Sequence, residues 1–443
     1  MELNEGQRVA FEQVQAGRNI FLTGPAGAGK SFLVKHIVDW ATKENKTISI
    51  TALTGCAALL LGQEAKTLHS WAGIGLARES IDPLEAIVRK NGKAVRRWRK
   101  AAILVVDEIS MMSPELFDKL DELGRRLRRC PKPWGGLQLI FCGDFFQLPP
   151  VSKGLSGEMP GRFVFESPLW KTSELYPAIL TRIERQADAD FQKLLNECRV
   201  GTPSEESIDL LNSRQGLEWK NNKIRPTLLF SRNADVDAVN KKNLDALKTE
   251  KRVYAAKTSI RHELMPDESD EEIPTGDILE RHVTRLDADA NYVPNLELKI
   301  GCQVMLIVNL NLEAGLVNGS RGVVTGFDYN NNPIVQFLQG LPTTIMRQIW
   351  KSAGNKRVQR SQIPLRVAYA VTIHKSQGAT LDCALVDIGT STFEYGQAYV
   401  ALSRVRNLES LYIWNLDPSR IRAHPAVRNF YKALEAKKET EST

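Results

Sequence analysis

The sequence predicts an α/β protein built on parallel sheets, with a smaller antiparallel β-barrel inserted in its second half. Short β-rich runs alternate with helical apolar stripes over the first half, an alternation typical of a parallel sheet. Between residues 315 and 364 the pattern changes. There, two β-rich runs flank the turn Asn330–Pro333, which is typical of an antiparallel hairpin.

The first half is expected to open with a helix, because Asn4 followed by Gln7 resembles a capping box. A further helix is expected after Ser113 and Pro114, an N-cap residue followed by proline at the first helical position. Strands are expected at 19–23, 47–53, 101–106 and 137–142, with a helix at 30–41.

From Leu180 onward the second half again alternates β-rich runs with helical stripes, although the alternation is less clear than in the first half. The inserted hairpin is expected at Gly322–Phe327 and Ile334–Phe337, and Thr343–Trp350 is expected to form another strand. Helical spacing returns at Val427, Phe430, Tyr431 and Leu434.

Composition excludes several classes of protein. The 443 residues include 59 Lys and Arg against 52 Asp and Glu, and the net charge of +7 weakly favours a polyanionic partner. No apolar run approaches the roughly 18 residues of a membrane span, and the first residues do not resemble a secretion signal. The six cysteines form no CxxC pair, which argues against zinc and disulfides. A cytoplasmic protein is expected, associated with the nucleoid if the source is bacterial.

A glycine-rich segment lies between the strand expected at 19–23 and the helix expected from residue 30. It fits the pattern GxxxxGK[ST] and consists of Gly24, Pro25, Ala26, Gly27, Ala28, Gly29, Lys30 and Ser31. Backbone N–H groups of such a loop surround phosphates, the lysine reaches the β- and γ-phosphates, and the hydroxyl binds Mg²⁺. The segment therefore predicts a nucleotide site with Mg²⁺.

Two carboxylates follow the apolar strand Ile103–Val106. Asp107 is expected to hold the metal, and Glu108 to orient and deprotonate the attacking water. Adjacent acids on a loop are usually only solvated. Together with the phosphate loop, however, they indicate hydrolysis rather than nucleotide binding alone.

The stretch Arg89–Lys100 holds seven Lys or Arg, no acid, and Trp98. Two interpretations stay open. It is either a solvated helix face or a nucleic-acid-facing insert in which cations meet phosphates and the aromatic meets a base.

Many segments, in order along the chain, resemble those of superfamily 1 helicases, and more narrowly the petite-integration-frequency (PIF) family of 5′-to-3′ DNA helicases. Besides the phosphate loop and Asp107–Ser110, they are Leu3–Gln7, Thr51–Ala58, Thr67–Gly75, Glu108–Arg128, Gly143–Val151, Glu184–Gln186, Val317–Val324, Thr372–Gly378 and Ala398–Leu411. The resemblance runs from about Leu3 to Trp414.

The resemblance implies two RecA-like lobes that clamp one ATP. We expect the first at residues 1–176, with a strand-splitting insert at about 67–100, and the second at 177–443, with a Src-homology-like barrel at about 315–364. Gln7 would read the adenine, although it can also cap its own helix. Gln147 would sense the γ-phosphate, and Arg185 and Arg404 would reach it from the second lobe as arginine fingers. Gln377 and Gly378 would line the cleft.

The same resemblance implies that single-stranded DNA lies across both lobes. The residues expected on its phosphates are Thr54, His69, Asn318, Arg321, Thr372, His374 and Lys375. Partners are then single-stranded DNA and tailed or forked duplexes. No membrane is expected, and the protein should be a monomer without DNA.

The function expected is an ATP-dependent 5′-to-3′ DNA helicase in genome maintenance, including repair, recombination, replication and telomere maintenance. Activity on quadruplexes or RNA–DNA hybrids is left open. Two alternatives remain: a translocase that strips proteins from single strands without unwinding, and a nucleotide-gated module that only binds single strands.

Overall fold

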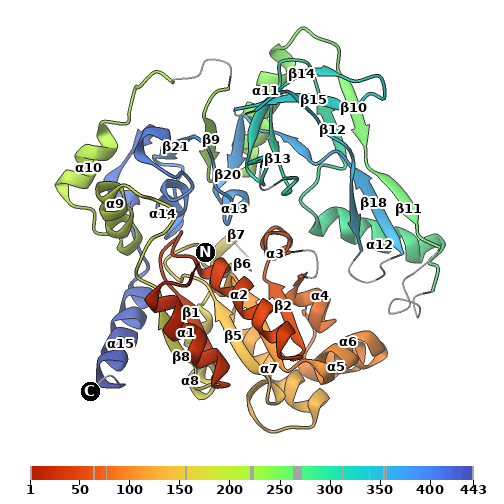
Figure 1. The fold of residues 1–443 in the computed structure, drawn as a ribbon, viewed down its shortest axis with the longest axis vertical. Coiled ribbons are helices and arrows are strands. Elements are labelled where there is room, and N and C mark those ends of the chain that lie inside the picture. The colour runs from red at the N-terminus through yellow and green to blue at the C-terminus, as the bar shows by residue number, and fades with distance from the viewer. Residues whose placement is uncertain are drawn as a thin grey trace. The chain divides into compact units, whose positions relative to one another are not determined.

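The chain folds into two compact units in a computed structural model (Figure 1). The structure describes residues 2–62, 65–75, 77–154, 157–219, 224–262, 272–311, 314–338, 340–352, 355 and 357–441. Unit 1 comprises Met1–Asp209, Phe393–Ser403 and Asp417–Thr443, and unit 2 comprises Leu210–Thr392 and Arg404–Leu416.

Unit 1 is built on a six-stranded sheet of order β3-β2-β4-β5-β1-β8 (Figure 1). Its strands are β1 (Ile20–Thr23), β2 (Ile48–Ala52), β3 (Lys66–Thr67), β4 (Ile103–Asp107), β5 (Gln138–Cys142) and β8 (Tyr176–Ile179). All neighbouring pairs are parallel. The loops that follow the strands therefore start from one edge of the sheet.

Unit 1 also holds helices, and a short hairpin of β6 (Val151–Gly154) and β7 (Gly157–Pro160) lies outside the sheet. The helices up to β5 are α1 (Glu5–Gln15), α2 (Lys30–Lys43), α3 (Gly55–Leu61), α4 (Leu68–Ala72), α5 (Ile81–Lys90), α6 (Gly92–Lys100) and α7 (Pro114–Arg128). Those after it are α8 (Pro168–Thr172), α9 (Ala189–Val200), α14 (Gln397–Leu402) and α15 (Pro425–Glu441), while α10 (Glu205–Asn212) spans the boundary between the two units. The capping box of α1 and the Ser113 cap of α7 are confirmed.

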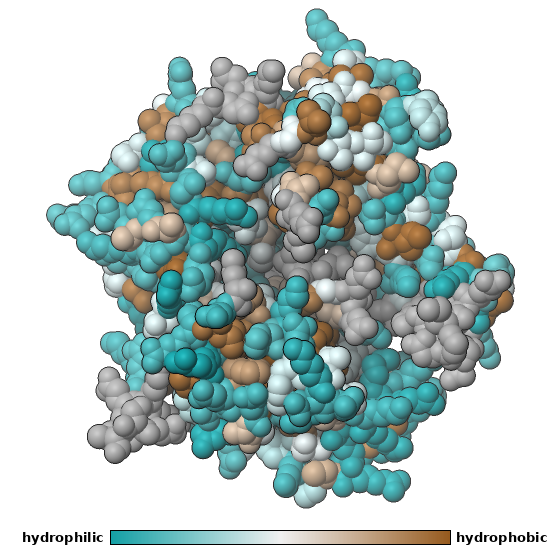
Figure 2. Space-filling model, in the orientation of Figure 1, coloured by the Kyte–Doolittle hydropathy of each residue, from teal (hydrophilic) through white to brown (hydrophobic). Residues whose placement is uncertain are grey.

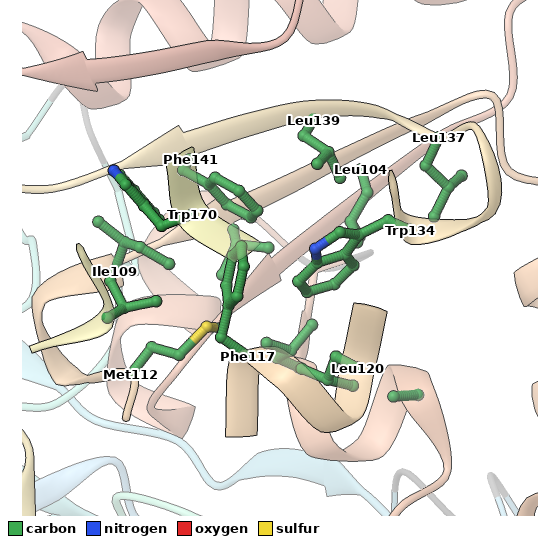
Figure 3. Close-up of a cluster of buried hydrophobic side chains, with 14 of the residues drawn as sticks. Leu104, Ile109, Met112, Phe117, Leu120, Trp134, Leu137, Leu139, Phe141 and Trp170 are labelled. Atoms are coloured by element: carbon green, nitrogen blue, oxygen red, sulfur yellow. The ribbon is translucent and has the colours of Figure 1, made fainter. Parts of the chain in front are cut away.

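Successive strand residues point to opposite faces, so the sheet separates two hydrophobic cores. Ile103 and Val105 of β4 belong to the core that contains α1 and α2 residues. Leu104 and Val106 belong to the other core, which includes residues of α4 to α7 and of α15. In that core, Phe117, Trp134 and Phe141 pack together with ring centroids 5.4–5.7 Å apart (Figure 3).

The predicted division between residues 176 and 177 differs from the observed units. It falls at the start of β8, whose whole length pairs with β1. Helix α15 also belongs to unit 1, because its apolar stripe, which includes Val427 and Tyr431, packs in the second of the two cores. The order of residues in the sequence does not show that the chain returns to the first unit, because α15 follows the strands of the second unit.

Unit 2 holds a parallel sheet of order β20-β9-β21-β22 and several antiparallel strands. The parallel strands are β9 (Thr227–Phe230), β20 (Ala370–Thr372), β21 (Ala384–Ile388) and β22 (Leu411–Leu416). The helices are α11 (Asn233–Ala246), α12 (Gly276–Asp289) and α13 (Ile373–Ser376). The antiparallel strands are β10 (Arg252–Ala255), β11 (Lys257–Ile260), β12 (Asn295–Leu298), β13 (Gln303–Leu306), β14 (Arg321–Phe327), β15 (Pro333–Phe337), β16 (Thr343–Thr344), β17 (Gln348–Lys351), β18 (Val358–Gln362) and β19 (Leu365–Val367).

The predicted hairpin is present, since β14 pairs with β15 across the Asn-rich turn. The expected strand Thr343–Trp350 is instead two strands, β16 and β17, in different sheets. Antiparallel pairing also begins upstream of the expected 315–364, because β11 pairs with β18 and β10 with β12. Pairing between strands about a hundred residues apart leaves no local signal in the sequence.

Candidate nucleotide and nucleic-acid site

The phosphate loop lies between β1 and α2, as predicted, and its glycines are required sterically. Gly24, Gly27 and Gly29 have φ of 147°, 84° and 80°, a region that other residues rarely adopt. A Cβ on Gly24 would lie 2.3 Å from the Leu180 carbonyl oxygen, and one on Gly27 would lie 2.6 Å from Cβ of Arg185. The loop is therefore closely packed against the segment that follows β8.

The loop is also fixed by hydrogen bonds. The Lys30 ammonium donates to the carbonyl oxygens of Gly24 (2.8 Å) and Pro25 (3.0 Å). The Ala26 N–H donates to the Tyr399 hydroxyl at 2.7 Å. Ser31 follows in the first turn of α2 and is exposed. Lys30 and Ser31 are thus on the same short turn at the carboxyl end of β1.

Gln7 caps its own helix and also lies beside the phosphate loop. Its side-chain oxygen accepts from the Asn4 N–H at 3.0 Å, which completes the capping box of α1. Its amide nitrogen lies 3.5 Å from the Gly29 carbonyl oxygen, at the end of the phosphate loop. The cap therefore holds Gln7 beside the loop, and an adenine-reading role stays a prediction.

Asp107 and Glu108 lie at the carboxyl end of β4, on the same edge of the sheet as the phosphate loop. Burial raises the pKa of Asp107, while the Glu108 N–H, the Cys142 thiol and the Lys30 charge oppose that rise. Carboxylate and hydroxyl oxygens, as in Asp107 and Ser31, are the donors that Mg²⁺ prefers.

The loop after β5 carries Gln147 and rests on a buried ion pair. Asp144 is fully buried and accepts from Arg199 of α9 at 2.8 and 2.9 Å. Burial alone would lower the pKa of Arg199, but the Asp144 carboxylate raises it above its ordinary value. The Gln147 N–H donates to the Asp144 carbonyl oxygen at 3.0 Å. The predicted phosphate sensor is therefore hydrogen-bonded through its backbone to the residue that forms the ion pair.

Tyr431 of α15 links this loop to the end of β1. Its hydroxyl lies 2.5 Å from the Thr23 hydroxyl and 3.2 Å from the Asp144 carboxylate, and it accepts from the Phe145 N–H. Burial raises the pKa of Tyr431, so the group stays a neutral phenol. Sequence analysis missed Asp144, Arg199, Tyr399 and Tyr431. For Tyr431 the only signal was its place in the apolar stripe of α15.

Arg185 was expected to act from the second lobe, and that expectation is wrong. It belongs to unit 1, where its N–H donates to the Gly27 carbonyl oxygen at 3.2 Å. Its guanidinium donates to the Ser403 carbonyl oxygen at 3.3 Å. The reason is that the chain stays in unit 1 beyond β8, so the segment after this strand runs alongside the phosphate loop.

Two candidate DNA contacts of unit 1 follow neighbouring strands. Thr54 caps α3 after β2, and its hydroxyl accepts from the Ala57 N–H at 3.2 Å. His69 lies half-buried in α4, directly after β3. Both are on the carboxyl edge of the sheet, like the phosphate loop.

Of the two interpretations left open for the basic stretch, the one in which Trp98 meets a base is wrong. Its side chain is fully buried, its indole N–H donates to the Ala72 carbonyl oxygen at 3.1 Å, and its ring lies 4.6 Å from that of Trp71. The basic stretch therefore places its aromatic in the core of unit 1.

In unit 2, Thr372 ends β20 and caps α13, where its hydroxyl accepts from the Lys375 N–H at 3.2 Å. His374 is half-buried and Lys375 is exposed. Gln377 and Gly378 follow this helix. Arg404 is 1% exposed, and its guanidinium donates to the carbonyl oxygens of Ser376 and Ala379, both at 3.4 Å. Thus Arg404 lies beside the segment that holds the other candidates of this unit.

Arg321 and Asn318 differ from each other in exposure. Arg321 is 1% exposed and donates to the Arg225 carbonyl oxygen at 2.6 Å, so the expected DNA contact is wrong and the guanidinium is structural. Burial lowers the pKa of Arg321. Asn318 is half-buried in the loop before β14, where its N–H donates to the Asn309 side chain.

Two features are absent from the part of the chain that the structure describes. No helix there is long and apolar enough to cross a membrane. No group of three or more His, Cys, Asp or Glu side chains there is arranged to hold a metal ion.

Comparison with known proteins decides the family. The profile of the PIF1-like helicases matches residues 2–207, and that of the Pif1 2B domain matches residues 285–327. A crystal structure of Pif1 helicase from Candida albicans is 34% identical, with a TM-score of 0.78 over 98% of this chain and 100% of that one. The chain belongs to the PIF1-like helicase family. Its two parallel sheets match the expected α/β fold.

Other members are similar over nearly the whole chain. The ATP-dependent DNA helicases PIF1 of Homo sapiens and Danio rerio are 40% and 39% identical over 98% of this chain, which spans 64% of their length. Bacteroides sp Pif1 in complex with ADP-AlF4 is 28% identical with a TM-score of 0.77, covering 99% of this chain and 98% of that one. Bacteroides Pif1 bound to ssDNA is also 28% identical, with a TM-score of 0.67 and the same coverage.

Proposed function

We propose that this member of the family is an ATP-dependent DNA helicase that moves 5′ to 3′ along a single strand and unwinds duplex DNA. One observation carries the proposal: the phosphate loop, the Asp107–Glu108 pair and the Gln147 loop all follow strands of one parallel sheet at one edge. That edge carries groups to bind phosphates and groups to activate water, as nucleotide hydrolysis requires.

The nucleotide in the proposal is ATP. Lys30 and the loop N–H groups bind the phosphates, and Glu108 takes a proton from the attacking water. Ser31 and Asp107 would hold Mg²⁺, which neutralises phosphate charge when bound. The complex of Bacteroides sp Pif1 with ADP-AlF4 supports nucleotide binding at this fold.

The nucleic acid in the proposal is single-stranded DNA that leads into a duplex. Thr54 and His69 in unit 1, and Thr372, His374 and Lys375 in unit 2, would contact its phosphates. The ssDNA complex of Bacteroides Pif1 supports this partner. A monomer without DNA, cytoplasmic placement and a role in genome maintenance belong to the same proposal.

Unwinding, rather than passive binding, accounts for a hydrolytic site. Opening one base-pair step costs about 1.4 kcal/mol, so ten steps cost about 14 kcal/mol. Contacts that do not change cannot supply that free energy repeatedly, at each base-pair step. Coupling each step to a nucleotide cycle does.

Strand displacement on duplexes with either a 5′ or a 3′ single-stranded tail tests the proposal. We expect unwinding from the 5′ tail only, with ATP consumed in both cases because both substrates offer single-stranded DNA. Equal unwinding from a 3′ tail would refute the direction. ATP hydrolysis without unwinding of either duplex would favour the protein-stripping translocase, and DNA binding without hydrolysis would favour the binding module.

A further inference from the structure

A basic hollow of about 560 Å³ lies in unit 1, where the ends of α6 and α7 meet the turn before β5. Four of the side chains that line it are cationic: Arg99, Arg128, Arg129 and Lys132. No acid is among the described residues of its lining. We call this hollow the basic pocket. Figure 2 shows mostly hydrophilic side chains over the region where Figure 1 places α5 and α6.

The charges of the basic pocket are not neutralised within the described part of the chain. Arg128 donates to the carbonyl oxygens of Gly135 (2.7 Å) and Ala101 (2.9 Å), and Arg99 donates to a backbone carbonyl as well. Among those residues, no ion pair includes any of the four cations. Carbonyl oxygens orient a guanidinium without cancelling its charge, so the pocket attracts anions.

Nearby arginines show the contrast. Arg125, one turn earlier on α7, pairs with Asp121 at 2.6 Å, and Arg126 pairs with Asp82 and Glu122, both at 2.6 Å. The chain thus provides acids for the cations on the neighbouring surface of α7 and not for those in the basic pocket.

Backbone geometry brings the turn that lines the pocket close to α7. Arg129, Gly135 and Gly136 have φ of 53°, 68° and 74°, so the chain turns sharply on both sides of Lys132. A Cβ on Gly135 would lie 2.4 Å from the Gly124 carbonyl oxygen, so only glycine permits the turn to approach α7 this closely.

The basic pocket lies at the opposite edge of the sheet from the candidate nucleotide site. Its residues precede β4 and β5, whereas Asp107 ends β4 and the Gln147 loop follows β5. A five-residue parallel strand spans about 16 Å. The pocket is therefore separate from the phosphate loop, and also from Thr54 and His69, which follow β2 and β3 at the carboxyl edge.

We propose that the basic pocket binds the phosphate backbone of double-stranded DNA, an inference that rests on the proposed helicase function. Its cations suit phosphates. Sites for single strands commonly add aromatic rings that stack on bases to the cations that meet phosphates, but the nearby rings of Trp98 and Trp134 are fully buried. A pocket that offers charge without an aromatic platform fits a duplex, whose bases are already stacked.

The test is binding of a 5′-tailed duplex, and of its single-stranded tail alone, by the variant Arg129→Gly/Lys132→Ala at several salt concentrations. Glycine suits the left-handed backbone at residue 129, so the variant removes two charges without adding strain. Each lost phosphate contact lowers the slope of log affinity against log salt by about 0.9. We expect a slope lower by about 2 on the tailed duplex only, with affinity for it about tenfold or more weaker at low salt.

The control is Lys35→Ala/Lys43→Ala, which removes two exposed charges from α2 and should leave both affinities unchanged. Equal loss of single-strand and duplex binding, or an equal effect of the control, would overturn the inference. So would a variant that loses only binding of inorganic pyrophosphate, because the pocket would then be a free-anion site. Single-strand-stimulated ATP hydrolysis should stay normal in the variant. If the wild type lacks that hydrolysis but binds duplex through the pocket, the proposed function fails and this inference stands.

Discussion

Glu108 has a backbone conformation that residues other than glycine rarely adopt, with φ 57° and ψ 40°. Such a conformation costs free energy and persists where the surroundings enforce it. Here the Glu108 N–H donates to the Asp107 carboxylate at 2.8 Å, so the backbone of Glu108 is tied to the side chain of the metal-binding candidate. This geometry suits a residue that acts on water beside a bound metal.

Glu108→Gln should retain ATP and single-strand binding and lose turnover by about 10²–10⁴-fold, because an amide can hold a water but cannot accept its proton. Stimulated ATPase and nucleotide affinity measured on one preparation check this. Glu115→Gln, at a side chain 63% exposed on α7, is the matched control and should turn over normally. Normal turnover of Glu108→Gln would make Glu108 an ordinary surface acid.

Burial decided which single residues were interpreted wrongly. Trp98 and Arg321 are an aromatic and a cation in basic or polar segments, which is the pattern expected of DNA contacts. Each points into the core of its own unit. Segment composition does not reveal which side of an element faces solvent, so these two positions could not be assigned from sequence.

At the scale of elements, β1, the loop after β5, α9 and α15 meet at the Asp144–Arg199 ion pair. Arg199 also lies over the rings of Phe146 (4.6 Å) and Tyr431 (5.2 Å). Two helices distant in sequence thereby support the loop that carries Gln147. The C-terminal helix is therefore part of the scaffold of the candidate nucleotide site.

Asp144→Asn should lower the free energy of unfolding by about 3–5 kcal/mol, because it leaves Arg199 buried without a counter-charge. Urea unfolding followed by fluorescence measures this, with Glu166→Gln at the exposed pair with Arg162 as a control that should cost about 0–1 kcal/mol. Adding Arg199→Met to Asp144→Asn should recover stability, since an apolar side chain fits between the two rings. A double variant no more stable than Asp144→Asn alone would contradict this account.

At the scale of the whole molecule, the arginine-finger role that the family resemblance implies for Arg404 is a prediction. Arg404→Ala should lower DNA-stimulated ATP turnover by at least about 10³-fold, since an arginine that neutralises phosphoryl charge is worth about 10³–10⁵ in related hydrolases. Stimulated ATPase at saturating DNA checks this. Affinity for single strands should change little.

Arg404→Lys separates this role from a structural one. An ammonium could still donate to the Ser376 and Ala379 carbonyl oxygens, but it cannot reproduce the planar guanidinium fork. We therefore expect near-normal thermal stability with poor turnover. Recovery of turnover by lysine, or normal turnover of Arg404→Ala, would assign Arg404 to the support of its own segment.

The sequence by itself determined the phosphate loop, the Asp107–Glu108 pair, the early strands and helices, the hairpin and the family resemblance. Each of these features depends on residues that are close together in the sequence, so residue spacing and local backbone preference are enough to predict it. Only the tertiary structure decided that α15 supports the first sheet, that Arg185 belongs to unit 1, and that the cations at the ends of α6 and α7 converge on one pocket. These features join residues far apart in the chain, and their positions are set by which faces become buried when the elements pack.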